Sequence, residues 1–187
     1  QLNPHFLFNT LNAISSLVVT GRNAEGEAML GKLSSFLRSA LSPDAIGTIS
    51  LGDELEALQT YLEIEAVRFG DRLTVDFVCP DEFLELGVPS FILQPIVENA
   101  VKHGVAPTSE PVLIEIVAER DGEALLLTVR NGRGRHDRTT APGIGVGLVN
   151  TARRLDVLYG ERASLDTVSD DKLFAVAVRL PLFDGQA

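Results

Sequence analysis

The chain has 187 residues, of which 45% are hydrophobic and 22% charged, and its formal net charge is −10. This length suggests one or two domains, and the composition is typical of a globular protein. The acidic balance argues against sequence-independent binding of nucleic acid. A single cysteine, Cys79, excludes an internal disulfide framework, and the absence of an apolar run of about 18 residues predicts no membrane span.

The first part of the chain predicts two helices. Apolar residues recur with a helical period over residues 4–20 and again over residues 28–41. Gly21-Arg22-Asn23 separates the two, and Ser42-Pro43 ends the second, because proline cannot continue a helix. The apolar sides of both helices indicate that they pack against other helices.

A third helix is expected over residues 51–69, where apolar positions again follow helical spacing. Its acidic first turn, Asp53-Glu54, suits the positive end of the helix dipole. Strands and helices then alternate. The expected strands cover residues 73–79, 112–118, 124–130, 163–168 and 173–180, and the expected helices cover residues 89–103 and 148–158. The predicted fold class is α+β, with N-terminal helices followed by a two-layer α/β sandwich.

A loop of about 17 residues is expected between residues 131 and 147, and loops of this length are often lids or binding loops. Gly143, Gly145 and Gly147 alternate in it before Leu148 opens a helix. Alternate glycines let a backbone approach phosphates closely, and a helix N-terminus favours anions. A flexible loop without a ligand would show the same pattern.

The helix expected before residue 104 has a polar face made by Asn99, Lys102 and His103, at positions i, i+3 and i+4. An amide oxygen suits Mg²⁺, and an ammonium group supplies a charge for phosphate. Glu98 lies about 100° around the helix, within reach of the same site or of solvent. The alternative is a solvated polar face with no ligand.

His5 and Asn9 share one face of the first helix. A neutral imidazole titrates near neutrality and can attack phosphorus to form a phosphoramidate. Phe6 and Phe8 flank it and predict packing against a partner helix. Taken alone, His5 is better explained as a structural histidine than as a reactive one.

These segments occur in a recognisable order. Residues 1–12, Gln-Leu-Asn-Pro-His-Phe-Leu-Phe-Asn-Thr-Leu-Asn, resemble the phosphoacceptor motif of the histidine kinase family typified by the LytS-type and YehU-type sensors. Residues 61–73 look like the next signature of that family. Residues 89–104 look like the N-box of its ATP-binding domain, and residues 143–155 look like its second glycine box. The resemblance covers nearly the whole chain.

The resemblance implies a domain division and a reaction. Residues 1–71 would be the dimerisation and histidine phosphotransfer region, N-terminally truncated, and residues 72–187 an ATP-binding domain of the GHKL or Bergerat type. The cofactors would be ATP and Mg²⁺, and the partners a second copy of the chain and a response regulator that receives the phosphoryl group on an aspartate. A cytoplasmic location is expected, with any membrane attachment through the missing upstream region.

The resemblance also assigns residues. His5 would be the phosphoacceptor, with Asn9 and Lys102 assisting catalysis, and Asn99 the metal ligand, with Glu98 as a second candidate. The residues expected to bind the nucleotide are Asn99, Lys102, His103, Asn131, Gly143, Gly145, Gly147 and Leu148.

Three positions depart from related patterns. Asn131 stands where the family usually places an adenine-reading aspartate, and Phe6 stands where many histidine kinases place an acid. No general base for His5 is therefore visible. Pro95 occupies the position at which ATPases such as gyrase need a glutamate, which argues against ATP hydrolysis. A catalytically impaired scaffold or ATP-binding module of the GHKL type is the alternative.

Overall fold

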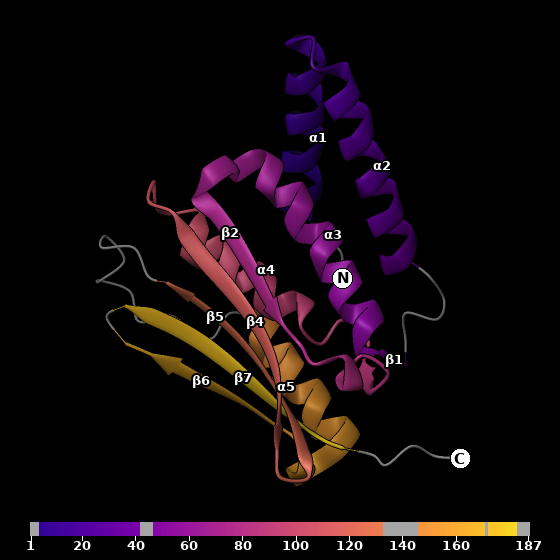
Figure 1. The fold of residues 1–187 in the computed structure, drawn as a ribbon, viewed down its shortest axis with the longest axis vertical. Coiled ribbons are helices and arrows are strands. Elements are labelled where there is room, and N and C mark those ends of the chain that lie inside the picture. The colour runs from indigo at the N-terminus through magenta and orange to yellow at the C-terminus, as the bar shows by residue number, and fades with distance from the viewer. Residues whose placement is uncertain (1–3, 42–46, 133–145, 171, 183–187) are drawn as a thin grey trace.

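The computed structural model describes residues 4–41, 47–132, 146–170 and 172–182. Helices α1 (Pro4–Val19) and α2 (Asn23–Ala40) form a hairpin that extends beyond one end of a sheet, and α3 (Leu51–Phe69) runs between the hairpin and the sheet (Figure 1). None of the helices in these described ranges combines the length and apolarity needed to cross a bilayer.

The main sheet of the described chain has five strands in the order β2-β4-β5-β7-β6. β2 pairs with β4 in parallel, and the other neighbours are antiparallel. The antiparallel pairs β4–β5 and β6–β7 are hairpins, as expected. The strand bounds are β2 Leu73–Val78, β4 Val112–Asp121, β5 Ala124–Gly132, β6 Ser164–Ser169 and β7 Leu173–Pro181.

Helices cover one face of the sheet, and the other face is exposed in the part of the chain that the structure describes. Along β4, Ile114 and Ile116 are buried while Leu113 is exposed and Glu115 half-exposed. This period of two is the signature of a strand with a single buried face. The helices α4 (Gln94–Ala100) and α5 (Val146–Tyr159) lie behind the strands in Figure 1. The two-layer sandwich expected from the sequence is confirmed.

The prediction of a helix over residues 89–103 is wrong at its start and in its last turn. Pro89 ends a short strand, β3 (Gly87–Pro89), which pairs with β1 (Thr48–Ser50). Phe91 has a φ of 55°, a left-handed backbone conformation that no helix continues through. The helix begins only at Gln94, with Pro95 in its first turn, and its last turn is a π-helix, η4 (Val101–Val105).

The other expected helices and strands are present, with ends shifted by a few residues. α2 begins at Asn23 instead of residue 28, and β4 extends to the turn at Gly122, whose φ is 63°. Gly70 ends α3 as expected, with a φ of 56°. The described residues also form three short 3-10 helices: η2 (Gly70–Arg72) after α3, η3 (Asp81–Phe83) after β2 and η5 (Gly160–Arg162) after α5.

Three aromatic rings join the N-terminal helices. The ring of Phe6 on α1 lies 5.3 Å from the ring of Phe36 on α2 and 4.9 Å from the ring of Tyr61 on α3. All three side chains are buried. Such aromatic pairs stabilise a fold by about 0.5–1.5 kcal/mol beyond the burial of their surface, so α1 is firmly held against α3.

A buried carboxylate fixes the turn that precedes α4. Glu54 is 1% exposed, and it accepts hydrogen bonds from the backbone N–H groups of Phe91 (2.7 Å) and Leu93 (2.9 Å). Glu54 therefore binds the backbone just before α4, whereas the sequence suggested only that it complements the dipole of its own helix, α3. Arg154 on α5 donates to the carbonyl oxygen of Ser90 and, at 3.3 Å, to its hydroxyl. Burial raises the pKa of Glu54, although the backbone donors and Arg154 act in the opposite direction.

We expect Glu54→Ala to destabilise the fold by about 3 kcal/mol, because it leaves two buried N–H groups without acceptors. Glu54→Gln, which keeps one oxygen, should cost less. Thermal and denaturant unfolding would measure both. Glu56→Ala, an exposed position on the same helix, is the control and should change stability by less than about 0.5 kcal/mol. Equal stability of Glu54→Ala and Glu56→Ala would contradict the assignment.

Candidate active site

His5 is presented on the surface of α1 by its buried neighbour. Phe6 is anchored in the aromatic cluster, and His5 beside it is exposed. One turn further along, the amide nitrogen of Asn9 lies 3.0 Å from Nδ1 of His5. The shared face expected from the spacing is confirmed, and Asn9 fixes the plane of the imidazole ring.

The polar residues of the predicted N-box lie on two kinds of helix. Asn99 is half-buried on α4, whereas Lys102 and His103 are exposed in the π-helical turn η4. A π turn holds more residues than an α turn, so the spacing of these three side chains differs from that of an ideal α-helix. Turns of this kind are frequent at functional sites.

Glu98 lies on the side of α4 that faces α3. Its carboxylate accepts a hydrogen bond of 2.9 Å from the side-chain amide of Gln94. Its negative charge also raises the pKa of Tyr61 and of Glu65, both on α3. Burial is the main cause of both shifts. Glu98 is therefore an electrostatic neighbour of α3 as well as of Asn99.

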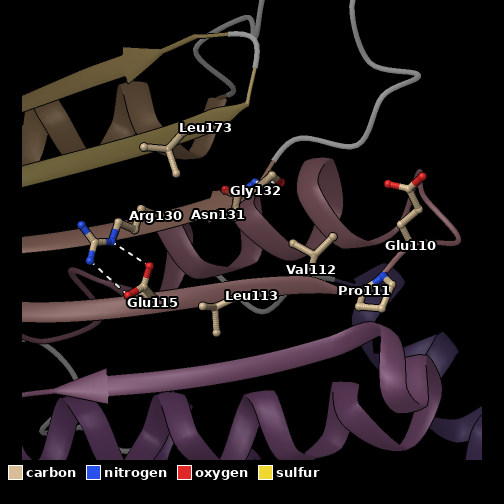
Figure 2. Close-up of a pocket in the computed structure, with 9 residues that line it drawn as sticks. All are labelled: Glu110, Pro111, Val112, Leu113, Glu115, Arg130, Asn131, Gly132 and Leu173. Atoms are coloured by element: carbon tan, nitrogen blue, oxygen red, sulfur yellow. Dashed lines mark hydrogen bonds and ion pairs between the residues drawn. The ribbon is translucent and has the colours of Figure 1, made fainter.

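Asn131, near the end of β5, is 4% exposed and packs against Gly104 in η4. A Cβ added to Gly104 would lie 3.0 Å from Cγ of Asn131 and still closer to its amide nitrogen. The preceding residue points to the opposite face: Arg130 forms two hydrogen bonds, of 2.9 and 3.0 Å, with Glu115 (Figure 2). The alternation places Asn131, and not Arg130, on the helix-covered side of the sheet.

We expect Gly104→Ala to destabilise the fold by about 1–3 kcal/mol, because the added methyl group would displace the buried Asn131 side chain. Thermal unfolding would measure the change, and Gly104→Ala/Asn131→Ala should recover part of the loss. Gly31→Ala is the matched control, since a Cβ there meets no atom within 4 Å on α2 and should be neutral or stabilising. A fully stable Gly104→Ala variant would contradict this packing.

The end of the glycine-rich loop adjoins α4. A Cβ added to Gly147 would lie 3.6 Å from Cβ of Pro95, and Leu148 is buried in the first turn of α5. Gly143 and Gly145 lie outside the described residues, so the expected lid stays a prediction there. Pro95 is in the first turn of α4, where it offers no acid or base.

The sequence interpretation assigned no chemistry to a polar cluster on α3. Glu65 is 4% exposed, and its Oε2 lies 3.0 Å from Nη1 of Arg68. Tyr61 lies one turn earlier, and burial, followed by the charge of Glu65, raises the pKa of its phenol. The spacing i, i+4 and i+7 of three polar groups on a largely apolar helix face was the available signal.

Comparison with known proteins bears on this site. The model of the family described as "Histidine kinase" matches residues 1–73. The chain is 37% identical to "Sensor protein LytS" of Staphylococcus haemolyticus over 97% of its length and 36% identical to "Sensor histidine kinase BtsS" of Escherichia coli over 98%. The chain belongs to the histidine kinase family. It spans about a third of the length of these curated relatives, 33% and 32% respectively.

Solved structures of histidine kinases share the fold. The catalytic domain of histidine kinase ThkA aligns with a TM-score of 0.54 at 14% identity. The alignment covers 72% of this chain and 95% of the ThkA domain. The histidine kinase domain of the Erythrobacter litoralis EL346 blue-light activated kinase covers 96% of both chains, at a TM-score of 0.51 and 14% identity. The α+β architecture of this histidine kinase family member is thus that of the catalytic domains of histidine kinases.

Proposed function

We propose that this chain is the catalytic core of a sensor histidine kinase. It transfers the γ-phosphoryl group of Mg²⁺-ATP to His5, and the group then passes to an aspartate of a response regulator. Residues 1–71 serve dimerisation and phosphotransfer, and residues 72–187 bind ATP.

The observation that carries this proposal is the meeting of two motifs at α3. Phe6, the neighbour of His5 on α1, packs against Tyr61 on α3, and Glu54 of the same helix α3 binds the turn that begins α4. α4 carries Asn99, the residue expected to hold the metal. The helix expected to accept the phosphoryl group and the helix expected to bind the nucleotide are therefore both attached to α3, which supports a role for both in one reaction.

The donor set near Asn99 fits Mg²⁺ carried by a triphosphate. Asn99 and Glu98 offer amide and carboxylate oxygens, which are hard ligands. Among the described residues, no group of three or more His, Cys, Asp or Glu could form a metal cage on its own. Mg²⁺ is usually bound by one or two protein groups together with substrate phosphates, so the sparse set is sufficient. The ion would neutralise charge on the phosphates.

Residues of the chain would orient the reacting groups and neutralise the charge of the phosphates. Lys102, exposed in η4, supplies a positive charge for the phosphates, and Asn9 orients the imidazole of His5. Asn131 lies buried beside the end of the same helical segment, where its carbonyl oxygen can accept a hydrogen bond from the adenine amino group. The observation that favours the alternative, an impaired scaffold, is this replacement of a carboxylate by an amide.

Incubation with γ-labelled ATP tests the reaction. We expect acid-labile label on the wild-type protein, no label on His5→Gln, and loss of labelling when EDTA removes Mg²⁺. Free phosphate without labelled protein would instead identify an ATPase.

Nucleotide titration provides the second measurement. Asn99→Ala should weaken Mg²⁺-dependent ATP binding by at least about tenfold, because a metal-ligand oxygen is lost, whereas His5→Gln should bind ATP normally. A wild-type protein that binds no ATP would leave the scaffold as the function.

The N-terminal helices support a homodimer. Phe8, Leu11 and Val18 lie exposed along one side of α1, and Leu30 is exposed on α2. The spacing of the α1 residues places them on one helical face. Contiguous exposed apolar residues of this kind mark interaction surfaces. A second copy of the same hairpin would cover them.

We expect Leu11→Glu to weaken the dimer by at least about tenfold, because it buries a charge at the interface. Sedimentation of the protein over a range of concentrations would measure the change. Val157→Glu, an exposed apolar position on α5, is the control and should leave assembly unchanged. A dimer that tolerates Leu11→Glu would place the interface elsewhere.

A further inference from the structure

One peptide bond just before α4 is held from both of its sides by charged groups. The carbonyl oxygen of Ser90 and the N–H group of Phe91 belong to this bond, which is trans. Arg154 donates to the carbonyl oxygen, and the carboxylate of Glu54 accepts from the N–H group at 2.7 Å. The two polar groups of a trans peptide point in opposite directions, so a guanidinium group and a carboxylate hold the same plane from opposite sides.

This double attachment sets the backbone conformation of the turn. A rotation of the peptide plane changes ψ of Ser90 and φ of Phe91 together. The φ of Phe91 is 55°, a left-handed conformation that a bulky side chain rarely adopts. Such a residue keeps its conformation only where surrounding contacts enforce it. The two charged groups are those contacts, and loss of either would let the plane turn.

Arg154 binds the turn at two points. Its Nη1 donates to the carbonyl oxygen of Ser90, and its Nη2 lies 3.3 Å from the hydroxyl of the same residue. Ser90 is 1% exposed, so water cannot readily replace the guanidinium group as a donor. A planar guanidinium group suits two neighbouring acceptors, whereas the ammonium group of a lysine is a single point of charge.

Arg154 lies on the side of α5 that faces α4. Gly147, Thr151 and Arg154 stand at i, i+4 and i+7, on one side of the helix. At one end of this row, a Cβ added to Gly147 would lie 3.6 Å from Cβ of Pro95 in the first turn of α4. In the middle, the buried hydroxyl of Thr151 donates to the carbonyl oxygen of Gly147 at 3.0 Å. α4 and α5 also pack against each other on the same face of the sheet (Figure 1).

The two segments expected to meet the nucleotide are therefore joined through this row. Asn99, expected to hold the metal, lies on α4, whose start follows the turn that Arg154 binds. Gly147, expected to face the phosphates, lies in the first turn of α5. One Mg²⁺-nucleotide can contact both segments only if their separation is fixed.

We infer that Arg154 is a positioning residue for nucleotide binding, which holds the peptide bond between Ser90 and Phe91 from α5 and thereby sets Asn99 against Gly147. The inference rests on the proposed function, because it assigns Arg154 a part in binding the nucleotide of that reaction. Arg154 lies two helical turns, about 10 Å, along α5 from Gly147. It acts through the backbone that it binds and makes no contact with the nucleotide.

The first test needs no nucleotide and measures hydrogen exchange of backbone amides by NMR. Arg154→Met keeps most of the apolar stem and removes the donors. We expect the amide hydrogens of Phe91 and Leu93 to exchange at least about tenfold faster in this variant, with unchanged exchange in β5 at the centre of the sheet. Arg153→Met is the matched control, because Arg153 is an exposed neighbour on α5 and its loss removes the same charge. Its exchange should match the wild type.

The second test is titration with Mg²⁺-ATP. Arg154→Met should bind at least about tenfold more weakly, and Arg153→Met normally. Asn99→Ala should weaken binding about tenfold in the wild type but only about threefold or less in Arg154→Met, because the metal ligand is already displaced there. A role confined to general stability would instead leave the two losses multiplicative.

The outcomes separate this inference from the proposed function. Unchanged ATP affinity in Arg154→Met, or multiplicative losses in Arg154→Met/Asn99→Ala, would overturn the inference, while label on His5 of the wild type would still support the proposed transfer. A wild-type protein that binds Mg²⁺-ATP without labelling His5 would contradict the transfer, and the exchange and titration results would still decide the role of Arg154.

A folding defect would not remove the test. If Arg154→Met unfolds, Arg154→Lys keeps the charge but offers only one point of attachment, and thermal unfolding checks its integrity. We expect exchange at Phe91 about threefold faster than in the wild type and a partial loss of ATP affinity. A folded Arg154→Lys with wild-type exchange and wild-type affinity would count against the role.

Discussion

The carboxylate of Glu54 is the constraint on which the arrangement of the site depends. It binds the backbone of the turn before α4 from α3, while Arg154 binds the same turn from α5. Without these bonds, nothing local would hold Phe91 in a left-handed conformation. The start of α4 is thus set by groups about 40 residues before it and about 60 after it in the chain, and the position of Asn99 follows from that start.

α3 therefore serves both halves of the site. Its first turn holds the start of α4 through Glu54, and Tyr61 further along it packs against Phe6 of α1. One rigid helix links the two reactants of the proposed transfer.

The sequence predicted what depends on local periodicity and could not predict what depends on distant contacts. Apolar spacing located α1, α3 and the strands, because burial on one side dictates that spacing. The start of α4 was missed because it is decided by Glu54, far away in the chain. The burial of Glu65 was not predicted either, because it depends on the packing of α3 against the rest of the fold and not on the spacing along that helix. The sequence could not predict that Asn131 points to the helix-covered face of the sheet, because that depends on the register of β5 against β4.

The parallel pairing of β2 with β4 bears on how the chain reaches this fold. Leu73 pairs with Val112, so this edge of the sheet closes a segment that contains β3, α4 and η4. The hairpins β4–β5 and β6–β7 need only short turns. Local contacts form faster than distant ones because they lose less chain entropy. We expect the two hairpins to assemble early and β2 to dock late, so that α4 becomes ordered in the final step of folding.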